Sequence, residues 1–94
     1  MVGGKIVDFY RLKSGSETVR FLARGTGGEA NDYCCVKAKI PEVVFKNLEI
    51  GNDIWWHHPY VYIKVFGVDD AKFDKVGYSG GDQEFFYKNK PVLI

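Results

Sequence analysis

The sequence has few cysteines, and those it has are poorly placed to form a disulfide or a metal site. The two cysteines are neighbours, Cys34 and Cys35, and neighbouring residues of a strand point to opposite faces. No CxxC pair is present, so the sequence offers neither a zinc cluster nor a redox motif. We therefore expect no metal, no cofactor and a reducing, cytoplasmic setting.

Long apolar runs and an excess of charge are also absent. No run approaches the length that spans a bilayer, and no apolar stretch follows the first five residues as it would in a signal peptide. We expect no membrane association. The 13 basic and 12 acidic side chains nearly balance, which excludes a strongly polycationic nucleic-acid binder and an acidic-tail function.

Aromatic residues, in contrast, are abundant, at 16% of the 94 residues. Large rings help a small core to bury enough area. A chain of this length is expected to form one domain, residues 1–94, which buries roughly 60–65% of its unfolded surface and has little room for a deep active site. Residues 54–66 hold both tryptophans and both histidines, and we expect the core to pass through this stretch.

β-Branched and aromatic residues predict a strand at residues 5–13. Alternation of apolar and polar residues predicts strands at residues 17–24 and 33–40. A Ser-Gly-Ser turn at 14–16 joins the first two into a hairpin. The residues predicted to face inward in the second and third strands are Val19, Phe21, Ala23, Cys34, Val36, Ala38 and Ile40. Their neighbours, many of them basic or aromatic, then face outward.

Residues 41–48 break this alternation. A proline at the start, an acidic residue after it and apolar residues at helical spacing predict a helix of one to two turns that plugs one end of a barrel. An irregular connection is the alternative.

Pro59 divides the aromatic stretch, because it cannot donate a hydrogen bond to a neighbouring strand. We predict two strands, 53–57 and 60–66, that meet at a tight turn over His58-Pro59. One long, kinked edge strand is the alternative. Two further strands are predicted at 72–78 and 84–87.

This order of elements predicts an all-β fold, or a β-rich α+β fold with one short helix. Three strands, a short helix and further strands match the outline of a small five- to six-stranded, OB-like barrel. An SH3-like barrel is the second choice. Element order concerns the fold alone and does not define a function.

Two motifs suggest metal binding or phosphate binding, but each lacks the residues that such a site requires. A metal site requires three or four converging ligands, whereas His57 and His58 are adjacent and would diverge on a strand. The glycine-rich segment 25–32 has neither the GxGxxG nor the Walker spacing of a phosphate loop. A turn histidine, a partly buried histidine and a mobile hairpin tip are the simpler interpretations.

Two catalytic arrangements are equally weakly supported. Cys35 could act as a nucleophile with His57 or His58 as its base, but nothing in the sequence places them together. The carboxylate pair Asp69-Asp70 lies in a loop, where such pairs are usually solvated. We therefore predict that the protein is not an enzyme, and keep a small enzyme that uses His57 or His58 as a minor alternative.

The best-supported feature is an outward face that is both basic and aromatic. Its predicted residues are Arg20, Arg24, Tyr33, Lys37, Lys39, Tyr60, Tyr62 and Lys64, with Trp56 at its end. Such a face would bind a protein partner, or a second copy of the chain, through aromatic anchors and arginines. Rings interleaved with cations also suit single-stranded nucleic acid, which is the alternative. Half-exposed tyrosines and protective lysines on an ordinary sheet would look the same.

Overall fold

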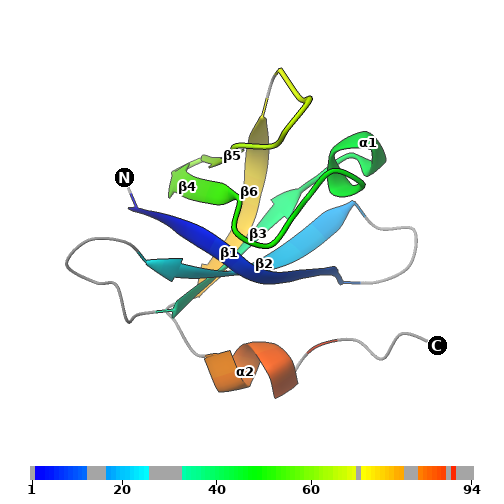
Figure 1. Ribbon diagram of the computed structural model, residues 1–94. Coiled ribbons are helices and arrows are strands. Elements are labelled where there is room, and N and C mark those ends of the chain that lie inside the picture. The colour runs from blue at the N-terminus through cyan, green and yellow to red at the C-terminus, as the bar shows by residue number, and fades with distance from the viewer. Residues whose placement is uncertain are drawn as a thin grey trace.

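Six antiparallel strands close into a barrel in the computed structural model, which describes residues 2–12, 17–25, 33–69, 71–79, 83–88 and 90 (Figure 1). The strands are β1 (Val2–Arg11), β2 (Thr18–Gly25), β3 (Tyr33–Lys39), β4 (Asp53–His57), β5 (Tyr60–Ile63) and β6 (Lys72–Ser79). Around the barrel they follow the order β1-β2-β3-β6-β5-β4, and β4 pairs with β1. Because β4 returns beside the first of three consecutive strands, these four form a Greek key. The predicted small, five- to six-stranded β-barrel is confirmed.

The inward-facing residues form the core that the alternation predicted. Those of β2, β3 and β5 that are buried, together with the residue after β3, are Val19, Phe21, Ala23, Val36, Ala38, Ile40, Val61 and Ile63. Cys34 is only partly buried and packs against the same cluster. Each fully buried valine, isoleucine or phenylalanine among them stabilises the fold by roughly 1.5–3 kcal/mol, so the barrel interior is the main source of stability.

A β-bulge in β1 allows that strand to contribute apolar residues to both sides of the barrel wall. The pairing with β2 shifts between Ile6 and Asp8, which makes Val7 the extra residue. Ile6 faces the core, whereas Val7 and Tyr10 join a second apolar cluster outside the barrel. Without the bulge, strict alternation would have placed Ile6 and Tyr10 on the same face.

The helix α1 (Glu42–Phe45) follows β3 and covers the end of the barrel at which that strand finishes (Figure 1). It begins after Pro41, whose carbonyl accepts hydrogen bonds from the N–H groups of Val44 and Phe45. Val44 and the following Leu48 are buried in the barrel core. The predicted helical plug is therefore confirmed.

The aromatic stretch forms a hairpin of two strands, as predicted. β4 and β5 meet at the turn over His58-Pro59, and the peptide bond between these two residues is cis. β5 ends at Ile63, earlier than the predicted 66, and pairs with β4 on one side and β6 on the other. The alternative of one kinked edge strand is wrong, and β5 has no open edge to which a partner strand could add.

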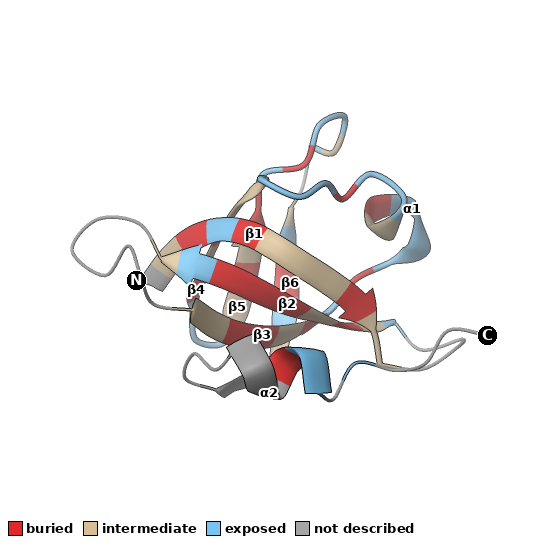
Figure 2. Ribbon diagram, turned by 60° about the horizontal axis from the view of Figure 1, so that its bottom comes forward, coloured by how far each residue is buried: buried red, intermediate tan, exposed pale blue. Residues whose placement is uncertain are grey.

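The predicted strand at 84–87 is also wrong, because these residues belong to the helix α2 (Gln83–Lys88). Phe86 is fully buried, with its ring centroid 4.8 Å from that of Tyr10, in a cluster that includes Leu22 and Cys35. α2 therefore lies against the outer side of the β1-β2-β3 sheet (Figure 2). Two causes act together: the closed barrel offers no edge to a seventh strand, and the apolar outer residues of β2 and β3 need a cover.

Some sequence-based predictions fall outside the described residues. These are the turn at 14–16, most of the glycine-rich segment 25–32 and one member of the Asp69-Asp70 pair. No helix among the described residues is long and apolar enough to cross a membrane.

Candidate binding surface on the barrel wall

The residues predicted to share one basic and aromatic face are divided between two walls of the barrel. One group extends from β2 and β3, and the other lies on and just after β5. On the barrel, β1 and β4 separate β2 from β5 on one side, and β6 separates β3 from β5 on the other. The prediction of one continuous face therefore does not hold. Alternation determines whether a side chain points inward or outward, but only barrel closure determines where around the wall it lies.

We call the first group the basic wall. It comprises Arg20, Arg24, Tyr33, Lys37 and Lys39. The Nη1 of Arg20 donates a hydrogen bond of 3.0 Å to the hydroxyl of Tyr10, and the guanidinium of Arg24 lies 5.8 Å from the ring centroid of Tyr33. The side chain of Lys37 runs across Gly77. A Cβ added to Gly77 would lie 2.7 Å from the Cε of Lys37. These contacts hold cationic side chains along the wall, beside the area that α2 covers.

Trp56 does not lie at the end of an outward face, contrary to the prediction. It is only 5% exposed and belongs to the barrel core, together with Ile54. Its neighbour Trp55 takes the outward position instead, because adjacent residues of a strand point to opposite sides. Trp55 is not among the residues predicted for the outward face, although a signal existed: the two-residue turn over His58-Pro59 pairs His57 with Tyr60 and hence Trp55 with Tyr62.

The second wall is built from three cross-strand rows on β1, β4, β5 and β6. The central row runs from Gly3 through Trp55 and Tyr62 to Lys72. On the α1 side of it lies a row of Lys5, Asp53 and Lys64, and on the opposite side lies a row of His57, Tyr60 and Asp74. We call these ten residues the aromatic wall.

The rings of the aromatic wall are in contact with one another. Trp55 and Tyr62 are stacked, with centroids 5.7 Å apart and planes within 6°, and Tyr60 meets Tyr62 edge-on at 6.5 Å. The ammonium of Lys72 lies 4.1 Å from the centroid of Tyr60, a cation–π geometry. All three rings are half-buried, so each supports its neighbour and still offers surface to solvent.

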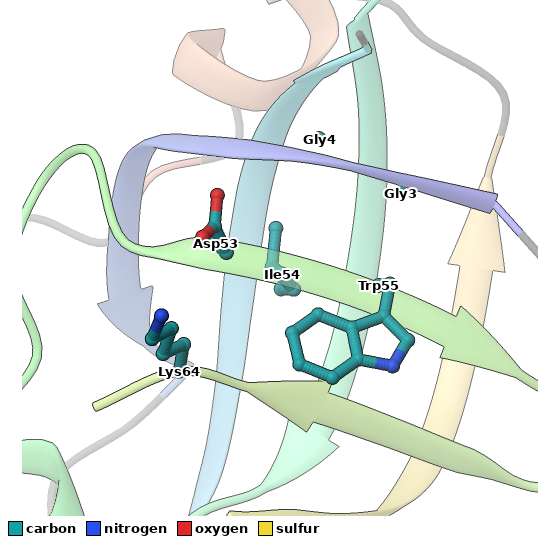
Figure 3. A pocket seen from close by; sticks show the side chains of 6 residues that line it. All are labelled: Gly3, Gly4, Asp53, Ile54, Trp55 and Lys64. Atoms are coloured by element: carbon teal, nitrogen blue, oxygen red, sulfur yellow. The ribbon is translucent and has the colours of Figure 1, made fainter.

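Beside Trp55 the wall is hollowed. The hollow is shallow and open, with a volume of about 350 Å³, and is lined by Gly3, Gly4, Asp53, Ile54, Trp55 and Lys64. The broad face of the indole is turned outward, with Asp53 and Lys64 at the other end of the hollow (Figure 3). Gly3, which pairs with Trp55 across the strands, has no side chain on this outer face, and this opens the space.

Charges of both signs border the hollow. The ammonium of Lys5 donates a hydrogen bond to Asp53 and forms an ion pair with it. This bond, followed by the positive charges of Lys5 and Lys64, lowers the pKa of Asp53 below its ordinary value despite an opposing effect of desolvation. Asp53 therefore carries its negative charge throughout the neutral pH range.

The side chains considered for catalysis or metal binding are not gathered into a site. Cys35 lies beneath α2, whereas His57 and His58 are exposed at the turn between β4 and β5. Among the described residues, no group of three or more histidine, cysteine, aspartate or glutamate side chains could hold a metal ion. The geometry thus defines a small closed barrel whose outer surface carries the basic wall and the aromatic wall. A scan against family models and searches of curated proteins and of solved structures find no match.

Proposed function

We propose that this protein is a non-enzymatic interaction module that binds a protein partner on the aromatic wall. The observation that supports this most is the contiguous cluster of Trp55, Tyr60 and Tyr62, with the outward indole of Trp55 beside an open hollow. Protein interfaces typically have aromatic residues at their centre and a polar rim. Tryptophan and tyrosine are also the side chains most enriched among residues that dominate binding energy.

The charges around the rings favour a protein over a nucleic acid on this wall. Asp53 and Asp74 lie in the same surface as Lys5, Lys64 and Lys72, so a phosphate chain would meet repulsion as well as attraction. A protein surface can match charges of both signs. Because β5 is paired on both sides, binding would use side chains rather than strand addition.

The nucleic-acid alternative applies to the basic wall. Its four cations, Arg20, Arg24, Lys37 and Lys39, belong to β2 and β3, and the guanidinium of Arg24 lies beside the ring of Tyr33. In OB barrels the outer face of the second and third strands binds oligonucleotides. We infer an OB-like arrangement from the short helix between β3 and β4 and from the return of β4 beside β1, although this barrel has six strands.

The two free cysteines agree with the cytoplasmic setting that we infer.

The two walls can be tested with matched variants. Tagged wild-type protein, Trp55→Ala and Lys37→Ala would be incubated with an extract of the source cells, and captured proteins quantified by mass spectrometry. We expect a set of proteins that Trp55→Ala loses and Lys37→Ala retains. If Trp55→Ala and Tyr62→Ala both retain every captured protein, the aromatic wall is not the binding surface.

Nucleic-acid binding is tested by titrating a mixed-sequence single-stranded oligonucleotide at low salt. Binding on the basic wall should weaken in Lys37→Ala and not in Trp55→Ala, and the logarithm of affinity should fall linearly with that of salt concentration. Absence of binding at low salt would exclude this alternative.

A further inference from the structure

The hollow beside Trp55 has an aromatic end and a charged end. At one end the half-buried indole of Trp55 turns its broad face outward, and at the other end lie Asp53 and Lys64 (Figure 3). Gly3 pairs with Trp55 and places no side chain over this face of the sheet. A group that fills the hollow therefore needs a flat apolar part and, beside it, a polar part of the right charge.

The charged end has one positive charge in excess. The carboxylate of Asp53 forms an ion pair with the ammonium of Lys5, so these two groups neutralise each other. The ammonium of Lys64 is exposed and has no ion pair or hydrogen bond with any of the residues that the structure describes. Lys64 is thus the available charge at this end, and it favours an anionic group in a ligand.

A cationic ligand fits the hollow less well. Arginine and lysine side chains bind to the faces of tryptophan rings, and a carboxylate nearby strengthens such binding. Here, however, Asp53 already accepts a hydrogen bond from Lys5 on one side, and Lys64 lies beside it on the other. A further cation would be repelled by both lysines. A neutral aromatic ring with a carboxylate near it meets no such repulsion.

The register determines how far the carboxylate must be from the ring. Lys64 follows β5 and lies opposite Asp53, two residues along β4 from Trp55, and its N–H donates to the carbonyl of Asp53. With about 4.8 Å between strands and 6.6 Å for two residues, the Cα atoms of Trp55 and Lys64 are about 8 Å apart. In an extended peptide, side chains two positions apart point the same way and are separated by about 6.6–6.8 Å. The flexible side chain of Lys64 spans the difference.

We propose that the hollow binds an aromatic side chain of an extended partner segment, in which an acidic residue two positions away pairs with Lys64. This inference rests on the proposed function, since it assumes that the aromatic wall binds protein, and it names the kind of segment that is bound. One ring and one exposed ion pair give an isolated peptide only weak affinity, with a dissociation constant on the order of millimolar. A whole partner gains affinity from further contacts with Tyr60 and Tyr62.

The experiment titrates capped pentapeptides, to about 10 mM because millimolar affinity is expected, into the full chain and follows the indole N–H of Trp55 by NMR. A peptide with phenylalanine and glutamate two positions apart, in one of the two orders, should shift this signal. Replacing its glutamate by glutamine should weaken binding about two- to fivefold, the size of an exposed ion pair, and replacing it by lysine should weaken binding further. Replacing its phenylalanine by alanine should abolish the shift.

Matched protein variants assign the preference for glutamate to one side chain. Lys64→Gln should bind the glutamate and glutamine peptides equally, because the ion pair is lost from both sides of the comparison. Lys37→Gln on the basic wall is the control and should keep the preference of the wild type. Both positions are on the barrel surface, and far-UV circular dichroism verifies that the variants are folded. The comparison of peptides on wild-type protein needs no variant.

Several results would overturn this inference. These are equal affinity of the wild type for the glutamate, glutamine and lysine peptides, a preference for the lysine peptide, and a preference for glutamate that Lys64→Gln retains. Absence of a shift with every peptide, or an oligonucleotide that shifts the Trp55 signal at lower concentration than the peptides, would also overturn it.

The proposed function is decided separately by the capture of proteins. If no peptide binds but Trp55→Ala still loses captured proteins, the aromatic wall remains the binding surface, and its partner is recognised by other features. If no peptide binds and both Trp55→Ala and Tyr62→Ala retain every captured protein, the proposed function fails as well.

Discussion

The indole ring of Trp55 stacks on the phenol ring of Tyr62, its partner across the β4-β5 hairpin, with centroids 5.7 Å apart and planes within 6°. The pair lies on the outer wall, whereas the next residue, Trp56, is buried in the core. The two adjacent tryptophans thus have different roles. Trp55 offers a surface for binding, and Trp56 stabilises the core.

Replacing each tryptophan by alanine separates these roles. Trp56→Ala leaves a large cavity and should lower the free energy of unfolding by about 3–5 kcal/mol. Trp55→Ala removes a half-buried ring and one aromatic pair, which should cost about 1–2 kcal/mol and abolish binding on the aromatic wall. Urea denaturation followed by circular dichroism measures both losses of stability. Equal losses would contradict the assignment of the two rings.

The two glycines beside Trp55 should also differ. A Cβ at Gly4 would lie 2.1 Å from the backbone carbonyl oxygen of Arg24, so Gly4→Ala forces β1 away from β2 and should cost about 3 kcal/mol. A Cβ at Gly3 would lie 3.0 Å from the Cβ of Trp55. Gly3→Ala should therefore cost less than Gly4→Ala and reduce binding at the hollow by displacing the indole. Thermal unfolding compares the two, and a Gly4→Ala variant as stable as wild type would show that the strands are not in such close contact.

The docking of α2 depends on Phe86. This side chain is fully buried against Tyr10, Leu22 and Cys35, whereas the adjacent Tyr87 is 45% exposed. Phe86→Ala should destabilise the protein by about 3–5 kcal/mol and expose Cys35 to thiol reagents. Tyr87→Ala is the matched control and should cost less than about 1 kcal/mol. The rate of Cys35 alkylation, followed by mass spectrometry, reports the undocking directly. An unchanged rate in Phe86→Ala would argue against this packing.

The Lys5–Asp53 ion pair predicts a pH dependence. Because the pKa of Asp53 is lowered in the folded protein, chiefly by the hydrogen bond from Lys5, its contribution to stability is present above the ordinary carboxyl pKa of about 4 and is lost as the pH falls through the lowered value. Lys5→Ala should raise the pKa of Asp53 toward its ordinary value, and Lys64→Ala should raise it less. Carbon-detected NMR titration of the carboxyl group measures both shifts. A pKa that does not respond to Lys5→Ala would refute the hydrogen bond from Lys5 as the main cause.

Local pattern was sufficient for most elements of the barrel. Strict alternation identified β2 and β3 and their inward residues, because a half-buried strand exposes every second side chain to the core. Pro59 correctly divided the aromatic stretch, since it cannot donate to a ladder. The run at 84–87 was misassigned because a short apolar segment fits a strand and a helix equally well. Its helical form lets Phe86 cover Leu22 and Cys35, which belong to strands far away in the sequence.

The sequence by itself determined which side chains of β2 and β3 face the core, and it placed the hairpin turn at His58-Pro59. Only the tertiary structure decided where the outward side chains lie around the barrel. Around the closed barrel, β1 and β4 lie between β2 and β5 on one side, and β6 lies between β3 and β5 on the other. Arg20 on β2 and Tyr62 on β5 therefore belong to different walls, although alternation predicts that both point outward. The physical reason is that side-chain alternation is a property of one strand, whereas neighbourhood on a closed surface depends on strand order and register, which are set by pairing between segments far apart in the chain.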